Sequence, residues 1–249
     1  MSTPTTAART TGPVALVTGA NKGIGYEIAA GLAALGHRVG IGARDAVRRE
    51  AAVASLRASG ADVFGVPLDV TDDASAAEAA RLVQQEAGRL DVLVNNAAIT
   101  GGPQQLPTTV DLAMMREVLE TNVLGVIRVT NAVLPLLRRS PAPRIVNMSS
   151  SVGSLTLQTS PDAETGPIAV AYSASKTYLN GVTVQYAKEL HGTGVLVNAA
   201  CPGFVATDLN GFRGTRSPEQ GAAIALRLAT LAADGPTGGF FDDAGAIAW

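Results

Sequence analysis

The amino-acid sequence predicts an α/β domain in which a seven-stranded parallel sheet carries helices on both faces. Three observations support this fold class. Short apolar runs rich in Val, Ile and Leu alternate with Ala-rich stretches at helical spacing, as they do in βαβ units. A chain of 249 residues, 47% of them hydrophobic, can bury a large core. The composition shows no break, so we expect one domain over residues 13–249 after a polar, disordered leader over residues 1–12.

The apolar runs and the helical patterns give the order of the expected elements. The strands are Val14–Thr18, Arg38–Gly42, Ala61–Pro67, Val92–Asn95, Arg144–Met148, Leu196–Ala199 and Gly239–Phe241. The helices are Gly25–Leu35, Ala46–Ser59, Asp73–Glu86, Met114–Arg139, Ser173–Leu190 and Pro218–Leu231. The phrases Thr71-Asp72-Asp73 and Ser217-Pro218-Glu219 place side-chain oxygens at the first free amides of two helices, and Pro135 predicts a kink or an early helix end.

Charge and cysteine content limit the partners and the compartment. With 19 basic and 21 acidic residues the net charge is -2, and no basic block is present, so nucleic acid is not expected as a partner. The single cysteine, Cys201, favours a reducing, cytoplasmic setting. The apolar runs are too short to cross a membrane. Neither His37 nor His191 has other ligands at suitable spacing, so we expect no metal site.

A glycine-rich turn follows the first strand and opens into a helix. A turn without side chains lets a pyrophosphate approach backbone amides at the positive end of the helix dipole. A glycine triplet is also found in ordinary tight turns, but its place between strand and helix favours a dinucleotide site. The expected cofactor contacts here are Gly19, Asn21, Lys22, Gly23, Ile24 and Gly25.

The end of the second strand distinguishes NAD from NADP. An NAD site needs a carboxylate there, and the aligned residue is Ala43, followed by Arg44. We expect Lys22, Arg44 and Arg48 to converge on a 2'-phosphate, which favours NADP(H). If the strand ends one or two residues later, Asp45 could instead hold the ribose and favour NAD.

Tyr172 and Lys176 lie four residues apart, on one face of an expected helix. A nearby ammonium favours the phenolate, so we expect it to lower the tyrosine pKa and let Tyr172 donate a proton to an alkoxide. A surface Tyr and Lys would give the same spacing. Upstream, the strand ending at Met148 opens into hydroxyls, of which Ser150 is the expected donor to a carbonyl oxygen and Ser149 the second choice. These serines could also simply cap the strand.

Several phrases occur in a fixed order along the chain: TGANKGIG, LDVTD, LVNNAA, IVNMSS, YSASK and CPGFVATD. Together they make the chain resemble a short-chain dehydrogenase/reductase, and within that superfamily it is similar to the carbonyl reductases. The resemblance covers nearly everything from Val14 to Trp249. It implies a Rossmann-type fold and an enzyme that transfers hydride from a nicotinamide cofactor to a small aldehyde, ketone or quinone.

The resemblance also implies roles for individual residues. The catalytic residues would be Asn122, Ser150, Tyr172 and Lys176. Ser150 would orient the carbonyl oxygen, Tyr172 would protonate it, and Lys176 would hold the nicotinamide ribose. Asn122 would lie at a helix irregularity that frees its backbone carbonyl to hold a water molecule.

Further cofactor contacts follow from the same resemblance. Asp69 and Val70 would flank the adenine, and Asn96 and Ala97 would line the ribose. Ala98 stands where the family more often has Gly and also belongs to this cofactor bed. The residues at the nicotinamide end would be Pro202, Gly203, Val205 and Thr207.

An insertion over Ser154–Val170 lengthens the interval between Ser150 and Tyr172. In similar carbonyl reductases a larger insertion covers the helical surface through which other members oligomerise. The insertion here is shorter, so the resemblance favours a monomer and leaves a homo-oligomer open. The insertion also offers Gln158, Asp162 and Glu164 as polar substrate contacts. Two other functions stay open: an NAD-dependent alcohol dehydrogenase of the same family, and a non-catalytic NADP-sensing module.

Overall fold

The computed structural model describes residues 12–102, 105–161 and 168–249. Within these ranges seven strands form one sheet in the order β3-β2-β1-β4-β5-β6-β7, and every neighbouring pair is parallel. The strands are β1 (Val14–Thr18), β2 (Arg38–Ala43), β3 (Val63–Pro67), β4 (Val92–Asn95), β5 (Arg144–Met148), β6 (Leu196–Ala200) and β7 (Phe240–Phe241). The predicted doubly wound α/β fold is therefore confirmed.

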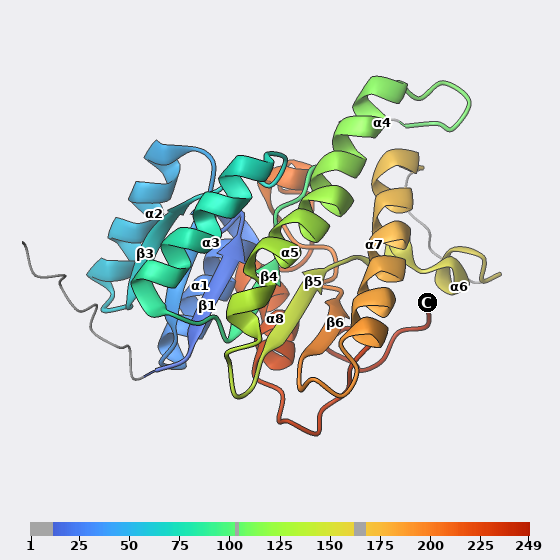
Figure 1. The fold of residues 1–249 in the computed structure, drawn as a ribbon. Helices are drawn as coiled ribbons and strands as arrows, with labels where there is room; N and C mark the ends of the chain where they lie inside the picture. Colours follow the sequence, from blue (N-terminus) through green and yellow to red (C-terminus); the bar gives the residue numbers. More distant parts are fainter. Residues whose placement is uncertain (1–11, 103–104, 162–167) are drawn as a thin grey trace, which may run out of the picture.

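Helices cover both faces of the sheet. They are α1 (Gly23–Ala34), α2 (Ala46–Ala58), α3 (Asp73–Ala87), α4 (Leu112–Leu119), α5 (Gly125–Leu137), α6 (Leu155–Gln158), α7 (Val170–Glu189) and α8 (Pro218–Ala229). One core cluster joins the sheet to α1, α2 and α8, and a second joins it to α3, α5 and α7. Figure 1 shows α3, α5 and α7 in front of the sheet. No helix within the described ranges is both long and apolar enough to cross a lipid bilayer.

The helix expected over Met114–Arg139 is divided. A π-helical segment, η1 (Glu120–Leu124), separates α4 from α5. The start at Met114 is also wrong by two residues, because the Asp111 carboxylate accepts a hydrogen bond from Ala113 N at 2.8 Å and caps an earlier first turn. Pro135 lies within the last turn of α5 and does not end it.

Other boundaries differ by one to three residues from the predicted ones. β3 begins at Val63 and β2 extends to Ala43. α7 begins at Val170, three residues before the expected start. Most of the expected leader, residues 1–11, lies outside the described residues, as do Asp162 and Glu164 of the insertion.

The strand order places the carboxyl ends of β1 and β4 side by side while their connections lead to opposite faces of the sheet. Such a switch point opens a crevice at the carboxyl edge of the sheet. Thr18, Asn95, Met148 and Ala200 are the last residues of the four central strands and all meet at this edge. The segments that follow them carry the predicted site residues.

Candidate active site

Tyr172 and Lys176 lie in the first two turns of α7, and the helix directs them to the carboxyl end of β5. Lys176 is only 3% exposed, and its Nζ donates a hydrogen bond to the Met148 carbonyl oxygen at 2.7 Å. The same Nζ lies 5.5 Å from the centroid of the Tyr172 ring. The buried lysine therefore lies beside a partly buried tyrosine, which excludes the reading of an exposed surface pair.

The structure distinguishes the two candidate serines. The Ser149 hydroxyl is buried and donates to Asn180 Oδ1 at 2.6 Å, so it is engaged inside the protein. Ser150 has an extended backbone, and its hydroxyl lies close enough to the Tyr172 phenol to lower the pKa of that phenol. A short 3-10 turn, η2 (Ser151–Gly153), follows. A Cβ on Gly153 would lie 2.7 Å from the Lys176 carbonyl carbon, so the glycine lets this turn pack against α7.

Asn122 lies in the π-helical segment, as the predicted helix irregularity required. Its buried side chain accepts a hydrogen bond from Ile99 N and donates to Ile99 O, both at 2.9 Å. Asn122 Nδ2 also donates to Ser175 Oγ at 3.0 Å, and Ser175 Oγ donates to the Tyr172 carbonyl oxygen at 2.7 Å. A chain of hydrogen bonds thus links Asn122 to the backbone of Tyr172. The water-holding role of its carbonyl stays a prediction.

Burial controls the proton affinities of the tyrosine and the lysine. Removal from water raises the pKa of Tyr172 to about 12, with a further increase from Cys201 and an opposing effect from the Ser150 hydroxyl. Burial also lowers the pKa of Lys176 to about 8. The expected lowering of the Tyr172 pKa by Lys176 is not found: removal from water is the largest influence on this pKa, and it raises it. The phenol keeps its proton at neutral pH and is suited to act as an acid.

The glycine turn packs tightly on the segment after β4. Gly19 and Gly23 have positive φ angles of 64° and 56°, which glycine adopts readily. A Cβ on Gly25 would lie 2.4 Å from Asn96 Nδ2, which donates to the carbonyl oxygens of Thr18 and Gly19 at 2.9 and 3.2 Å. The absence of side chains therefore serves this close approach. Asn96 acts as a clamp on the turn.

The start of α1 fits an anionic group. The helix begins within the glycine turn, and its N-cap residue, Lys22, makes no side-chain capping hydrogen bond. Free first-turn amides and the positive end of the helix dipole favour a phosphate. Asn21 and Ile24 belong to the same turn. Together with the glycines, these residues could hold the pyrophosphate of a dinucleotide.

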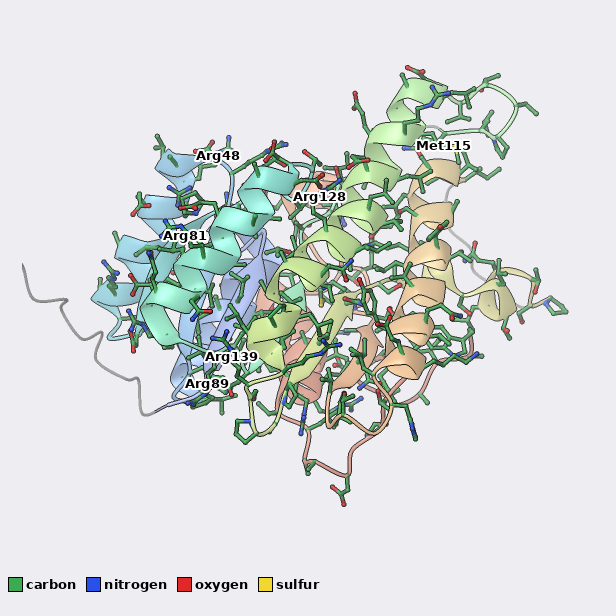
Figure 2. All side chains as sticks on the ribbon, viewed as in Figure 1. Arg48, Arg81, Arg89, Met115, Arg128 and Arg139 are labelled. Atoms are coloured by element: carbon green, nitrogen blue, oxygen red, sulfur yellow. The ribbon has the colours of Figure 1, made fainter. Side chains whose placement is uncertain are left out.

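Two of the three cations expected at the 2'-phosphate are paired with carboxylates, and their convergence on a phosphate stays a prediction. Lys22 Nζ forms an ion pair with Asp208 Oδ2 at 3.2 Å, and Arg48 Nε lies 3.5 Å from Asp45 Oδ2. Arg44 is exposed at the end of β2 and forms no ion pair within the described part of the chain. Figure 2 shows Arg48 near the start of α2. Arg44 is thus the cation best placed to meet a phosphate.

Asp45 has a structural task. β2 ends at Ala43, one residue later than expected, which is the condition under which Asp45 could hold a ribose. However, Asp45 caps α2, since its Oδ1 accepts a hydrogen bond from Arg48 N at 3.0 Å. Its carboxylate is therefore turned toward the helix.

Asp69 and Val70 lie after β3 at the same edge of the sheet. The Asp69 carboxylate accepts hydrogen bonds from Thr71 N at 3.0 Å and Thr71 Oγ1 at 2.7 Å, which with Arg44 and Arg128 hold its pKa below the usual value. The Val70 carbonyl accepts from Arg128 Nη1 at 2.7 Å. Arg128, which Figure 2 labels between α3 and α5, also pairs with Asp73. These contacts fix the predicted adenine-binding loop.

The segment after β6 reaches back to the glycine turn. Val205 is buried against Gly221, and the Thr207 methyl lies 3.4 Å from where a Cβ on Gly23 would be. Pro202 and Thr207 are partly buried, whereas Gly203 is exposed. Ala97 N donates to Thr18 Oγ1 at 3.0 Å, and Ala98 follows it, so the predicted cofactor bed is continuous with the turn.

Sequence reasoning missed three residues that support the site. Ser175 and Asn180 hold the Tyr172 carbonyl and the Ser149 hydroxyl, and Gln105 contacts the start of α7. Asn180 was detectable, because it lies four residues after Lys176 on the same helix face. Gln105 gave no signal, since it contacts residues far along the chain.

A Rossmann-type sheet with a glycine turn, a Tyr-Lys pair and serines at one edge defines a dinucleotide-binding oxidoreductase. The family described as short chain dehydrogenase matches residues 13–217. The chain belongs to this family, whose members use nicotinamide cofactors, and within it is carbonyl-reductase-like.

Three relatives illustrate the similarity. A short-chain dehydrogenase of Penicillium roqueforti, anuI, is 36% identical over 233 residues, which is 90% of each chain. A carbonyl reductase (NADPH) of Sus scrofa is 34% identical over 278 residues, 95% of this chain and 94% of its own. The structure of NADPH-bound carbonyl reductase from chicken fatty liver aligns with a TM-score of 0.82 and 28% identity, covering 97% of this chain and 100% of that one.

The glycine packing predicts opposite effects of two Gly→Ala substitutions. Gly25→Ala places a methyl 2.4 Å from Asn96 Nδ2, so we expect a stability loss of about 2 kcal/mol and at least tenfold weaker nucleotide binding. Gly181→Ala is the matched control, since nothing lies within 4 Å on α7, and should gain about 0.5–1 kcal/mol. Urea unfolding and titration with reduced nicotinamide nucleotides measure both. Unchanged nucleotide affinity in Gly25→Ala would contradict the clamp.

The buried lysine predicts a pH dependence of stability. Folding lowers the Lys176 pKa from 10.5 to about 8, so between these values the unfolded chain binds more protons than the folded one. The stability contributed by this group therefore rises with pH across that window. We expect the free energy of unfolding of the wild type, minus that of Lys176→Met, to increase by up to about 3 kcal/mol from pH 7.5 to 10.5. A flat or falling difference in urea unfolding would reject the buried ammonium.

Proposed function

We propose that this protein reduces a small aldehyde, ketone or quinone with NADPH, and that Tyr172 is the general acid. The observation that carries the proposal is the partly buried Tyr172 beside Ser150 and the buried Lys176, at the carboxyl edge of the sheet. The phenol there holds its proton at neutral pH. Relatives named as carbonyl reductases support the reaction type.

Each of these residues has its own role in the proposed reaction. When bound, the nicotinamide supplies a hydride to the carbonyl carbon. The Ser150 hydroxyl orients the carbonyl oxygen and stabilises the negative charge that grows on it. The Tyr172 Oη–H bond breaks as its proton passes to that oxygen, which completes the alcohol. Lys176 holds the nicotinamide ribose, and its ammonium stabilises the phenolate left behind.

Arg44 favours NADPH over NADH in this proposal. It is an exposed cation at the end of β2, beside the loop of Asp69, whose pKa it lowers. Asp45 caps α2 and leaves the ribose position without a carboxylate from this turn, which disfavours the NAD-dependent alcohol dehydrogenase. Lys22 would reach the phosphate only by leaving Asp208. A non-catalytic NADP-sensing module would have no use for Tyr172 beside a buried Lys176.

Two further expectations accompany the proposed reaction. The single cysteine, buried at position 201, suits a cytoplasmic enzyme. The monomeric state expected from the insertion stays a prediction. The described part of that insertion includes α6, and Tyr178 on α7 is 58% exposed.

Substituting the phenol tests the mechanism. We expect Tyr172→Phe to lose about 10²–10⁴-fold in kcat with NADPH and a panel of aldehydes, ketones and quinones, because the proton donor is removed. Nucleotide binding should be preserved, as measured by NADPH fluorescence. Tyr178→Phe, an exposed tyrosine on the same helix, is the matched control and should keep full activity. Full turnover by the Tyr172 variant would refute the proposed mechanism.

Removing the cation after β2 tests the cofactor preference. We expect Arg44→Ala to raise the KM for NADPH about tenfold and to leave the KM for NADH nearly unchanged, because only NADPH carries the 2'-phosphate. Arg81→Ala, which removes an exposed arginine paired with Glu78 on α3, should change neither constant. Equal effects of the Arg44 substitution on both nucleotides would show that the phosphate binds elsewhere.

A further inference from the structure

Gln105 lies after β4 and contacts the start of α7 with both its backbone and its side chain. Its side chain is 1% exposed. Oε1 accepts a hydrogen bond from Ala171 N at 3.0 Å, and the Gln105 carbonyl accepts one from Val170 N at 3.1 Å. Gln105 also forms an isolated parallel bridge with Ala169. One residue therefore holds three consecutive positions directly before Tyr172.

These contacts replace a missing helix cap. The first amides of a helix have no partner within the helix, and a Ser, Thr, Asp or Asn at the N-cap commonly supplies one. The N-cap of α7 is Ala169, which makes no side-chain capping hydrogen bond. Gln105 supplies two acceptors from a distant part of the chain. The start of α7 therefore depends on Gln105, and with it the direction in which the helix presents Tyr172.

The Nε2 group of the Gln105 amide holds the loop after β4. Nε2 donates to Thr100 O at 2.6 Å and to Gly102 O at 2.9 Å. These bonds fix a turn in which Gly101 and Gly102 have φ angles of 82° and 95°. The amide thus joins this loop to the helix that carries the phenol.

A second set of hydrogen bonds holds the backbone on the C-terminal side of Tyr172. The Tyr172 carbonyl accepts a hydrogen bond from Ser175, which accepts one from Asn122, and Asn122 holds Ile99 of the same loop. Gln105 fixes the Ala171 amide that precedes the tyrosine. The peptide group after Tyr172 is therefore attached to the loop through Asn122, and the Val170–Ala171 peptide group, one residue before the tyrosine, is attached through Gln105.

We propose that Gln105 is a positioning residue for the reaction: it caps α7 from outside and thereby aims the Tyr172 phenol at the reacting carbonyl oxygen. The inference rests on the proposed function of Tyr172. Gln105 takes no part in proton transfer. Because a misplacement of about 1 Å can cost on the order of a hundredfold in rate, loss of the cap should appear in kcat.

Two variants of Gln105 separate its effects. Gln105→Met keeps the length of the side chain and removes every side-chain hydrogen bond, so kcat should fall about ten- to a hundredfold, with the KM for NADPH within about threefold of wild type. Gln105→Glu, assayed at pH 6, keeps the acceptor for Ala171 N. Burial and the facing carbonyls favour its neutral form, which can still donate once. This conservative variant should recover most of the lost kcat.

Asn198→Leu is the matched control for a purely structural role. Asn198 is another amide that is 1% exposed, donating to Pro236 O at 2.7 Å and accepting from Gly239 N at 3.0 Å, at the β6–β7 edge. Its loss should lower the Tm by an amount comparable to Gln105→Met and leave kcat unchanged. If both variants lose kcat equally, or if Gln105→Met keeps kcat within threefold, the positioning role is wrong.

A readout without turnover keeps this test independent of the proposed function. The chain has four tyrosines, so 3-fluorotyrosine labelling gives four fluorine resonances, and Tyr172→Phe assigns the one of interest. In Gln105→Met we expect the Tyr172 resonance to shift or broaden, while those of Tyr178 and Tyr186 on the same helix stay in place. An unchanged Tyr172 resonance would overturn the inference. Absence of carbonyl reduction by the wild type would instead overturn the proposed function, and the fluorine resonances would still show whether Gln105 positions Tyr172.

Discussion

The burial of the Lys176 ammonium at the carboxyl end of β5 is the constraint on which the site depends. A charge removed from water is costly, so it needs a polar partner, and the Met148 carbonyl provides one at 2.7 Å. That contact requires α7 to lie close to the turn after β5, which Gly153 permits because a Cβ there would meet the helix backbone. Once α7 is fixed in this way, Tyr172 lies one helical turn from the lysine and beside Ser150. The geometry of the site is thus a consequence of how one helix packs on one strand.

Amide side chains hold the irregular backbone around this site. Asn96 fixes the glycine turn, Asn180 joins the segment after β5 to α7, and Asn122 and Gln105 hold the loop after β4. An amide offers both donors and an acceptor, so a single side chain can satisfy two loops at once. Loops that carry binding residues need such support, because they lack the hydrogen bonds of helices and strands. The carboxyl edge of the sheet is therefore built from loops tied by buried Asn and Gln.

Much of this arrangement could be predicted from the sequence, and the exceptions share a physical cause. The strands were readable because the parallel sheet is buried on both faces and its strands are short apolar runs, and the YSASK phrase located Tyr172 and Lys176 through helix periodicity. The start of α7 was not readable, since its cap comes from Gln105. The pairing of Lys22 with Asp208 was missed for the same reason, because it joins two loops far apart in the sequence. The Tyr172 pKa was expected in the wrong direction because a sequence shows the neighbouring charge and not the loss of water.

The π-helical segment has a consequence for how insertions and deletions act on this chain. A π-bulge accommodates one residue more than a regular α-helix would in the same span, so Glu120–Leu124 behaves as a built-in register shift between α4 and α5. Deleting one residue there would remove the bulge and leave a regular helix in the same span, whereas the same residues wound as a regular α-helix would turn α4 by about 100° and shift it by about 1.5 Å relative to α5. Met114 and Val118 would rotate away from Gly101, and Asn122 would lose Ile99. The π-helical segment therefore sets the orientation of α4 relative to α5.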